Sequence, residues 1–164
     1  METQEELDKL IEDFLDVARI SGVPLSRHKI KLEILSVPHH RPTRLPTGKK
    51  AIYIFRCNEC CLKIGKANPG SQARFTSQHY KPGRAPSTLA ESILNSKGLL
   101  KSKLPSTMHV EIDRLSERDI ESWIENNTTR YHFFVDADVD DLVLSLFEVF
   151  AQCRLKPLFE GKMA

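Results

Sequence analysis

The stretch AIYIFRCNECCLKIGKA, residues 51–67, decides the fold. It contains two short apolar runs, AIYIF and CCLKIGKA, which are separated by RCNE. Aromatic and β-branched residues dominate the first run, as is typical of strands, and the gap between the runs is short enough for a hairpin. We therefore expect a β-hairpin at the start of the core.

Downstream of the hairpin the chain alternates between expected helices and strands. Ser87 and Ser116 stand where helix N-caps are expected. In the last helix the apolar spacing predicts one buried face, made of Val139, Leu142, Val143, Leu146, Phe150 and Cys153. Helices are predicted over 71–80, 87–96, 116–127 and 136–155, and strands over 109–113 and 130–136.

Upstream of the hairpin, the first residues predict a helix with one apolar stripe, which ends before Gly22 and Pro24. Residues 28–35 alternate as a short strand does. Residues 36–50 form a proline-rich basic loop, which suggests a boundary between an extension, 1–47, and a core, 48–164. The mixture of helices and strands predicts an α+β fold, with a small antiparallel sheet opened by a hairpin and flanked by helices. The stripe comprises Leu7, Leu10, Ile11, Phe14 and Ala18.

The composition excludes several classes of protein. No apolar run approaches the roughly 18 residues of a membrane span, and the acidic N-terminus lacks the features of a signal peptide, so a cytoplasmic protein is expected. Three of the four cysteines crowd into residues 57–61, which suits reduced thiols better than a disulfide framework. No second ligand pair stands at the spacing of a structural zinc site.

The net charge of +2 conceals an uneven distribution of charge along the chain. Residues 1–16 carry seven acids and one base, and residues 17–103 carry seventeen bases and three acids. Residues 104–164 carry six bases and twelve acids. A basic middle between acidic ends indicates a polyanionic partner.

The hairpin and the residues that follow it resemble the GIY-YIG nuclease family. Ala51-Ile52-Tyr53 and Lys63-Ile64-Gly65 stand for the two signature tripeptides, with Ala for the first Gly and Lys for the second Tyr. An Arg about nine residues after the second Gly, a Glu in a late helix, and then a Pro and an aromatic residue complete the order. The resemblance covers roughly residues 48–161 and implies an insertion near 103–129.

The resemblance implies a role for each of five residues. Tyr53 would activate or orient the attacking water; a free tyrosine has a pKa of about 10, so a neighbouring Lys63 or Arg74 would have to lower that pKa. Lys63 and Arg74 would hold the phosphate. His79, five positions after the Arg rather than the family's four, would shuttle a proton, with Tyr80 as a weaker stand-in. Glu148 would bind Mg²⁺ or Mn²⁺.

Two further features concern the surroundings of that site. Glu160 stands where the family has Asn and is given no role. Because four of the five residues lie in the basic block, the last helix must bring Glu148 back to them. Candidate phosphate contacts are Arg41, Arg44, Lys49, Lys50, Lys66, Lys81 and Arg84, and candidates to enter a DNA groove are Arg27, His28, His39, His40 and Arg44.

The expected function is that of a divalent-metal-dependent DNA endonuclease. The small size of the chain is closer to that of a restriction or defence enzyme than to that of a multi-domain repair enzyme. Double-stranded DNA is the expected partner, and cutting both strands requires a homodimer or sequential nicking. The altered tripeptides and Glu160 leave an alternative open. The chain could be a nucleic-acid-binding module that kept the fold and lost hydrolysis.

Overall fold

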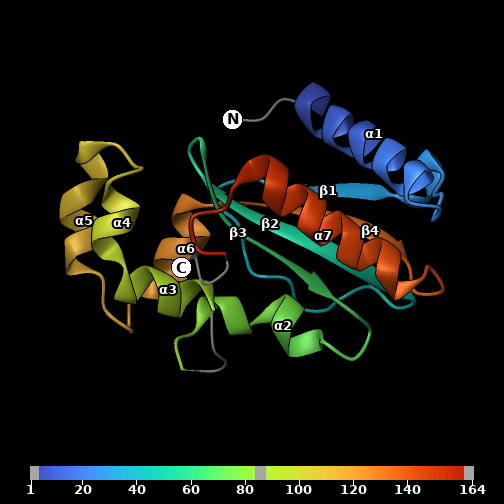
Figure 1. Ribbon diagram of the computed structural model, residues 1–164. Coiled ribbons are helices and arrows are strands. Elements are labelled where there is room, and N and C mark those ends of the chain that lie inside the picture. The colour runs from blue at the N-terminus through green and yellow to red at the C-terminus, as the bar shows by residue number, and fades with distance from the viewer. Residues whose placement is uncertain (1–3, 84–87, 161–164) are drawn as a thin grey trace.

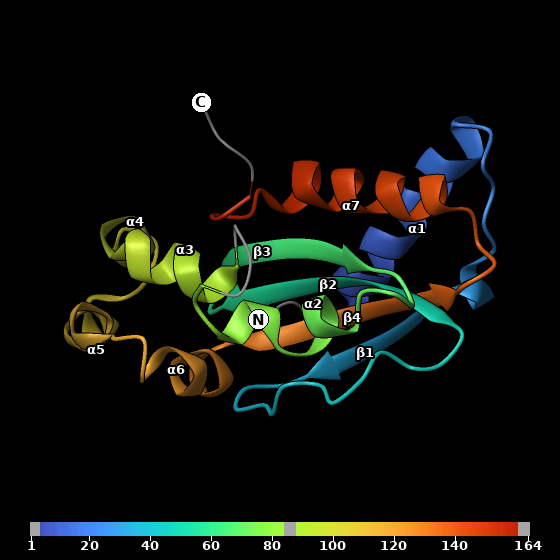
Figure 2. The ribbon, with the colours of Figure 1, turned by 90° about the horizontal axis from the view of Figure 1, so that it is seen from below.

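A four-stranded antiparallel sheet forms the centre of the computed structural model, which describes residues 4–83 and 88–160. The strand order is β1-β4-β2-β3, and helices cover both faces (Figures 1 and 2). This arrangement confirms the predicted α+β class. The strands are β1 (Lys31–Leu35), β2 (Lys49–Cys57), β3 (Cys60–Ala67) and β4 (Thr129–Asp136).

The predicted hairpin is strands β2 and β3, and it places β3 at one edge of the sheet. Two residues, Asn58 and Glu59, connect the strands, and Asn58 adopts the left-handed conformation with φ 50°. Asn tolerates that conformation better than most residues. A register shift between Phe55 and Arg56 sets Lys63 opposite Phe55 and Gly65 opposite Tyr53.

Helices α1 (Gln4–Ile20) and α7 (Asp141–Leu155) cover one face of the sheet (Figure 1). Phe14 of α1 stacks on Phe147 of α7 with ring centroids 4.2 Å apart. The apolar stripe of α1 is buried as predicted. The predicted buried face of the last helix is confirmed only in part: Val143 is buried, and Val139, Leu146 and Phe150 pack against the same core. The helix is apolar almost all round, so its spacing selects no single face. Leu142 is 67% exposed and Cys153 is exposed, whereas the buried residues are Val143, Leu144, Phe147 and Ala151.

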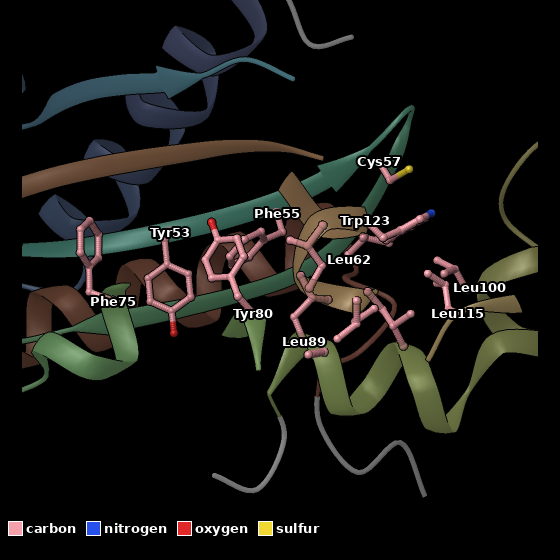
Figure 3. Packing of buried hydrophobic residues seen from close by; sticks show 14 of the residues in the cluster. Tyr53, Phe55, Cys57, Leu62, Phe75, Tyr80, Leu89, Leu100, Leu115 and Trp123 are labelled. Atoms are coloured by element: carbon pink, nitrogen blue, oxygen red, sulfur yellow. The ribbon is translucent and has the colours of Figure 1, made fainter. Parts of the chain in front are cut away.

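The other face is covered by the short helices between β3 and β4. Their apolar residues pack with Tyr53, Phe55, Cys57 and Leu62 of the hairpin in the cluster that Figure 3 shows in part. Residues 109–113 were expected as a strand and are helical, since the sheet offers them no neighbouring strand to pair with. These elements are α2 (Gln72–Thr76), η2 (Gln78–Tyr80), α3 (Leu89–Asn95), α4 (Lys97–Lys101), η3 (Ser106–Met108), α5 (His109–Arg114) and α6 (Ile120–Asn127).

Helix caps differ from the predicted ones. Thr88 caps α3 by accepting a hydrogen bond from the backbone N–H of Glu91 at 3.2 Å; the predicted cap, Ser87, lies outside the described residues. Asp119 is the N-cap residue of α6, and Ser116 lies in the turn before it, donating to the Asp119 carboxylate at 2.6 Å. Both segments offer several Ser, Thr and Asp candidates, and only the turn geometry selects among them.

The segment predicted as an N-terminal extension contributes to the same sheet. Strand β1 pairs with β4 over its whole length, and η1 (Arg27–Lys29) precedes it. Leu45, in the proline-rich loop, is buried in the core beneath α2 and α3. Lys49 and Lys50, which were expected in that loop, begin strand β2. No helix in the described ranges is long and apolar enough to cross a bilayer.

Candidate active site

Tyr53 and Gly65 determine where the candidate site lies. Tyr53 stands directly opposite Gly65 in the edge strand β3, and its fully buried side chain lies beneath that glycine. A Cβ atom on residue 65 would be 2.3 Å from the Tyr53 hydroxyl oxygen, far inside van der Waals contact. The phenol therefore reaches the edge of the sheet only because position 65 carries no side chain.

Arg74 and His79 meet the Tyr53 hydroxyl from the layer below the sheet. Arg74 Nε donates to the hydroxyl oxygen at 3.2 Å, and His79 Nε2 lies 2.6 Å from the same oxygen. The predicted single helix over 71–80 ends at Thr76, and a 3-10 turn follows it. This break rotates residue 79 rather than 78 toward Tyr53, which accounts for the spacing of five. Tyr80 lies apart from this cluster, with its hydroxyl directed away from that of Tyr53 (Figure 3).

Hydrogen bonding determines the tautomer of His79. The backbone N–H of Leu89 donates to His79 Nδ1 at 3.2 Å, so the proton of the neutral ring is on Nε2. Burial, and then the cations Arg130, Lys63 and Arg74, hold the pKa of His79 well below its ordinary value. Neutral His79 therefore donates to Tyr53, whereas a proton shuttle would begin by accepting the phenolic proton.

The Tyr53 hydroxyl oxygen thus accepts two N–H bonds, and its own hydrogen is left to point at a third partner. Burial raises the pKa of Tyr53, while Arg74 and Arg130 oppose that rise. The lowered pKa that Tyr53 would need to act as a base at pH 7 is therefore not reached in the protein without DNA. Burial disfavours the charged form more than the arginines favour it, and Tyr53 is a neutral phenol at pH 7.

Lys63 is buried on β3 and is paired with Glu160. The Lys63 Nζ atom lies 3.3 Å from Glu160 Oε1 and 3.3 Å from the Phe159 carbonyl oxygen. Residues 158–160 run beside β3, where the N–H groups of Leu158 and Phe159 donate to Cys61 and Leu62, each at 2.9 Å. Glu160 also accepts from the Ile64 N–H at 3.1 Å. No role was predicted for Glu160; the signal that could have identified it is its position after a proline and an aromatic residue.

Glu148 of α7 approaches the same edge from the opposite layer. Its side chain is 16% exposed, and Oε2 lies 3.3 Å from Lys66 Nζ, which also contacts Ser145 Oγ at 2.8 Å. The charge of Glu148 raises the pKa values of both Tyr53 and Arg74. The last helix therefore brings this carboxylate back to the basic block, as the order of residues requires.

Several predicted phosphate contacts are engaged in ion pairs. Lys49 pairs with Asp136 at 2.5 Å, Lys50 with Asp141 at 2.8 Å, and Arg41 with Glu121 at 2.6 Å. These three cations are therefore partly neutralised by acids of the C-terminal block. In the described part of the chain, Arg44 and Lys81 carry no ion pair, and the predicted contact Arg84 lies outside it.

The predicted groove residues differ in their environment. His39 is buried, with Nε2 2.8 Å from the Tyr80 hydroxyl and Nδ1 2.8 Å from the Thr128 carbonyl oxygen. It therefore cannot enter a DNA groove without leaving the core, and its assignment is wrong. Arg27 pairs with Asp8 at 2.9 Å. His28 and His40 are exposed.

The cysteines are all present as thiols, as expected. Cys57 and Cys60 are opposite one another at the end of the hairpin, and burial raises the pKa of the Cys57 thiol to about 12. Thiols with raised pKa values are poor metal ligands because the thiolate is the ligand form. Across residues 4–83 and 88–160, no set of three His, Cys, Asp or Glu side chains is placed to hold a metal ion.

Three buried histidines make stability depend on pH. Burial lowers the pKa of His132 to about 2 although Glu33 lies 2.7 Å away, because that carboxylate is half exposed; it also lowers the pKa values of His39 and His79. Below pH 6.5 the unfolded chain binds protons that the folded chain does not, so stability falls as pH falls. We expect a loss of up to about 2 kcal/mol from His132 between pH 6.5 and 5, and His39 and His79 contribute in the same direction.

Urea unfolding at pH 7.5, 6.5, 5.5 and 5.0 measures this loss. The variant His132→Phe removes one titrating group among the rings of Phe75 and Phe134. Its free energy of unfolding should fall less steeply over this range than that of the wild-type protein. Equal slopes for the two proteins would contradict the assignment of His132 as a neutral buried ring.

Comparison with models of known families, with curated proteins and with solved structures gives no match. The resemblance to GIY-YIG nucleases therefore depends on the residues and their arrangement in this chain. Tyr53, Arg74 and His79 share hydrogen bonds, and the charge of Glu148 acts on the first two. Lys63 is close enough to lower the pKa of His79, but its ammonium is engaged by Glu160.

Proposed function

We propose that this chain is a divalent-metal-dependent DNA endonuclease of the GIY-YIG type. The observation that carries the proposal is the contact between Tyr53 and Arg74 at the Gly65 edge of the sheet, with Glu148 paired to Lys66, the next residue of β3. Tyr53 reaches that edge beneath the glycine, Arg74 donates to its hydroxyl at 3.2 Å, and the charge of Glu148 acts on both from the other layer. A phenol, a guanidinium and a carboxylate are the groups that phosphodiester hydrolysis needs.

Arg74 is suited to bind the phosphate. The residue is exposed, and Tyr53 engages only its Nε atom. The two terminal nitrogens are then directed away from Tyr53, where a planar guanidinium can form two parallel bonds to phosphate oxygens. As a neutral phenol, Tyr53 would orient the attacking water through the hydroxyl hydrogen, which neither Arg74 nor His79 uses; it would accept a proton from that water only as the tyrosinate.

Glu148 fits a cation site with a single protein carboxylate. The ammonium of Lys66, 3.3 Å from its Oε2 atom, shows that this carboxylate is already oriented toward a positive charge. Mg²⁺ commonly takes one or two carboxylates and completes its shell with water and substrate phosphate. When bound, the ion would neutralise charge on the phosphoryl oxygens. Lys66 would then be released toward the DNA backbone.

One arrangement favours the alternative, a DNA-binding module without hydrolysis. Glu160 forms an ion pair with the ammonium of Lys63, and burial keeps Tyr53 neutral. The first feature would keep Lys63 from the phosphate unless DNA displaces the carboxylate, and the second would keep Tyr53 from accepting a proton from water. The alternative predicts salt-sensitive DNA binding with no cleavage in any divalent metal.

Cleavage of supercoiled plasmid with Mg²⁺ or Mn²⁺ separates the two functions. We expect nicked product, and a rate at least about 10²-fold lower for Tyr53→Phe, because this variant loses only the hydroxyl that directs the reaction. Tyr131→Phe is the matched control, since Tyr131 lies on the opposite face of the sheet. Binding without nicking in every metal would establish the alternative, and equal rates for Tyr53→Phe and wild type would remove Tyr53 from the site.

A further inference from the structure

A buried arginine lies beneath Tyr53. Arg130 belongs to β4, opposite Phe55 of β2, and it is the largest fully buried side chain in the described ranges. The guanidinium lies 5.1 Å from the centre of the Tyr53 ring and 4.8 Å from the centres of the Phe55 and Phe75 rings. Aromatic faces attract a cation, and the attraction strengthens where water is excluded.

The polar contacts of Arg130 leave its charge without an anionic partner. Nη1 donates to the Tyr80 hydroxyl at 3.2 Å, Nη2 donates to the Phe75 carbonyl oxygen at 2.6 Å, and Nε has no hydrogen-bond partner. Within residues 4–83 and 88–160, no carboxylate forms an ion pair with it. A buried charge lacking a counter-ion is costly, and the aromatic rings offset only part of that cost.

Two side chains in contact with Arg130 can become anions, Tyr53 and Tyr80. The Tyr80 hydroxyl is enclosed, because it bonds Arg130 and contacts His39 Nε2 at 2.8 Å. The Tyr53 hydroxyl meets two N–H donors, Arg74 and His79, at the edge where the candidate site lies. An anion on Tyr53 would therefore be held by two donors and by the guanidinium beneath its ring.

The other charged and titratable groups around Tyr53 determine what Arg130 has to supply. Arg74 of α2 is cationic, whereas His79 of η2 and His132 of β4 are neutral rings. Glu148 of α7 opposes a negative charge on Tyr53. On β3, Lys66 pairs with Glu148 and Lys63 with Glu160, each at 3.3 Å, so both ammonium groups are engaged by carboxylates. Without Arg130, Arg74 would be the remaining cation in contact with Tyr53 among the described residues.

We propose that Arg130 is a positioning residue that stabilises the tyrosinate form of Tyr53, the form able to accept a proton from an attacking water. It acts through the ring and touches neither the water nor the phosphate. The proposal rests on the nuclease function, which gives tyrosinate a purpose, but the electrostatic effect itself is measurable without DNA or metal.

Labelling the tyrosine Cζ atoms with ¹³C makes the effect visible, because the chain has only three tyrosines and each Cζ shift reports its own ring. Tyr53→Phe and Tyr80→Phe spectra assign the signals. In Arg130→Gln, which keeps hydrogen-bonding capacity and loses the charge, we expect the Tyr53 titration to move up by about one pH unit or more. Arg130→Lys places an ammonium in a buried site without a counter-ion. It loses its proton below the high pH at which a buried tyrosine titrates, so the Tyr53 titration should move up in this variant as well.

Plasmid nicking against pH is the second measurement. If Arg130 acts through ionisation of Tyr53, Arg130→Gln shifts the pH–rate profile upward by the same amount, which is about tenfold in rate at pH 7.5 for one unit. Its KM should be unchanged. A role in packing alone would lower stability without moving either titration.

Each outcome decides the proposal. An unshifted Tyr53 titration in Arg130→Gln overturns it, and so does an unshifted titration in Arg130→Lys, which tests it even where Arg130→Gln does not fold. A shifted titration in a protein that never cleaves DNA separates the two proposals, since it supports the coupling of Arg130 to Tyr53 while the nuclease function fails.

Discussion

Replacing Glu148 with Gln is expected to lower DNA nicking by at least about 10²-fold at every concentration of Mg²⁺ or Mn²⁺. The amide keeps the size of the side chain but removes the charge that would hold the cation. It also leaves the Lys66 ammonium, 3.3 Å away in the wild-type protein, without its anion. DNA affinity should be unchanged or higher, since a negative charge is lost beside the phosphate site.

The matched control for this variant is Glu117→Gln, which removes the same charge from an exposed position in the helical segment between β3 and β4. Nicking rates over a range of Mg²⁺ concentrations, together with DNA binding by fluorescence anisotropy, give the two quantities required. A Glu148→Gln protein that nicks DNA as fast as Glu117→Gln would exclude Glu148 as the metal carboxylate.

The second large effect is expected for Gly65→Ala. The added methyl would lie 2.3 Å from the Tyr53 hydroxyl oxygen and 2.5 Å from the ring carbon that bears it. The phenol has to move, and it then loses its contacts with Arg74 and His79. We expect nicking to fall by at least about 10²-fold and the free energy of unfolding to fall by about 1–3 kcal/mol.

Gly70→Ala is the control for Gly65→Ala, because a Cβ there meets nothing within 4 Å. The double variant Gly65→Ala, Tyr53→Leu tests the origin of the effect. Removal of the ring should recover most of the lost stability and none of the activity. Urea unfolding and plasmid nicking are the measurements, and a Gly65→Ala protein with unchanged stability would show that Tyr53 does not lie beneath this glycine.

Prediction from the sequence succeeded where a local pattern has only one structural solution. The runs around Tyr53 and Gly65 form a hairpin because their composition suits strands and the gap between them is short. Tyr53 and Arg74, which were predicted to act together, share a hydrogen bond. Prediction failed where a pattern fits more than one structure. Residues 109–113 were predicted as a strand from their composition, but they have no strand to pair with and are helical.

Two residues of the site escaped prediction because their importance depends on contacts. Arg130 reads as one more charge at the start of a strand, although Arg130, His132 and Phe134 alternate onto one face of it. Glu160 reads as a loop acid until the chain returns beside β3 and places it against Lys63. In each case the signal is a charged side chain in a buried environment, and burial is a property of the folded chain.

The sequence by itself determined the strands, most of the helices, and the kinds of chemical group available along the chain, because these depend on neighbours within a few residues. Only the tertiary structure decided which face of α7 is buried, that residue 79 rather than 78 meets Tyr53, and which cations are already neutralised. Those outcomes depend on which side chains exclude water from one another across the sheet. Lys63 and Lys66 are each paired with a carboxylate in the folded chain. Within residues 4–83 and 88–160, no carboxylate pairs with Arg130.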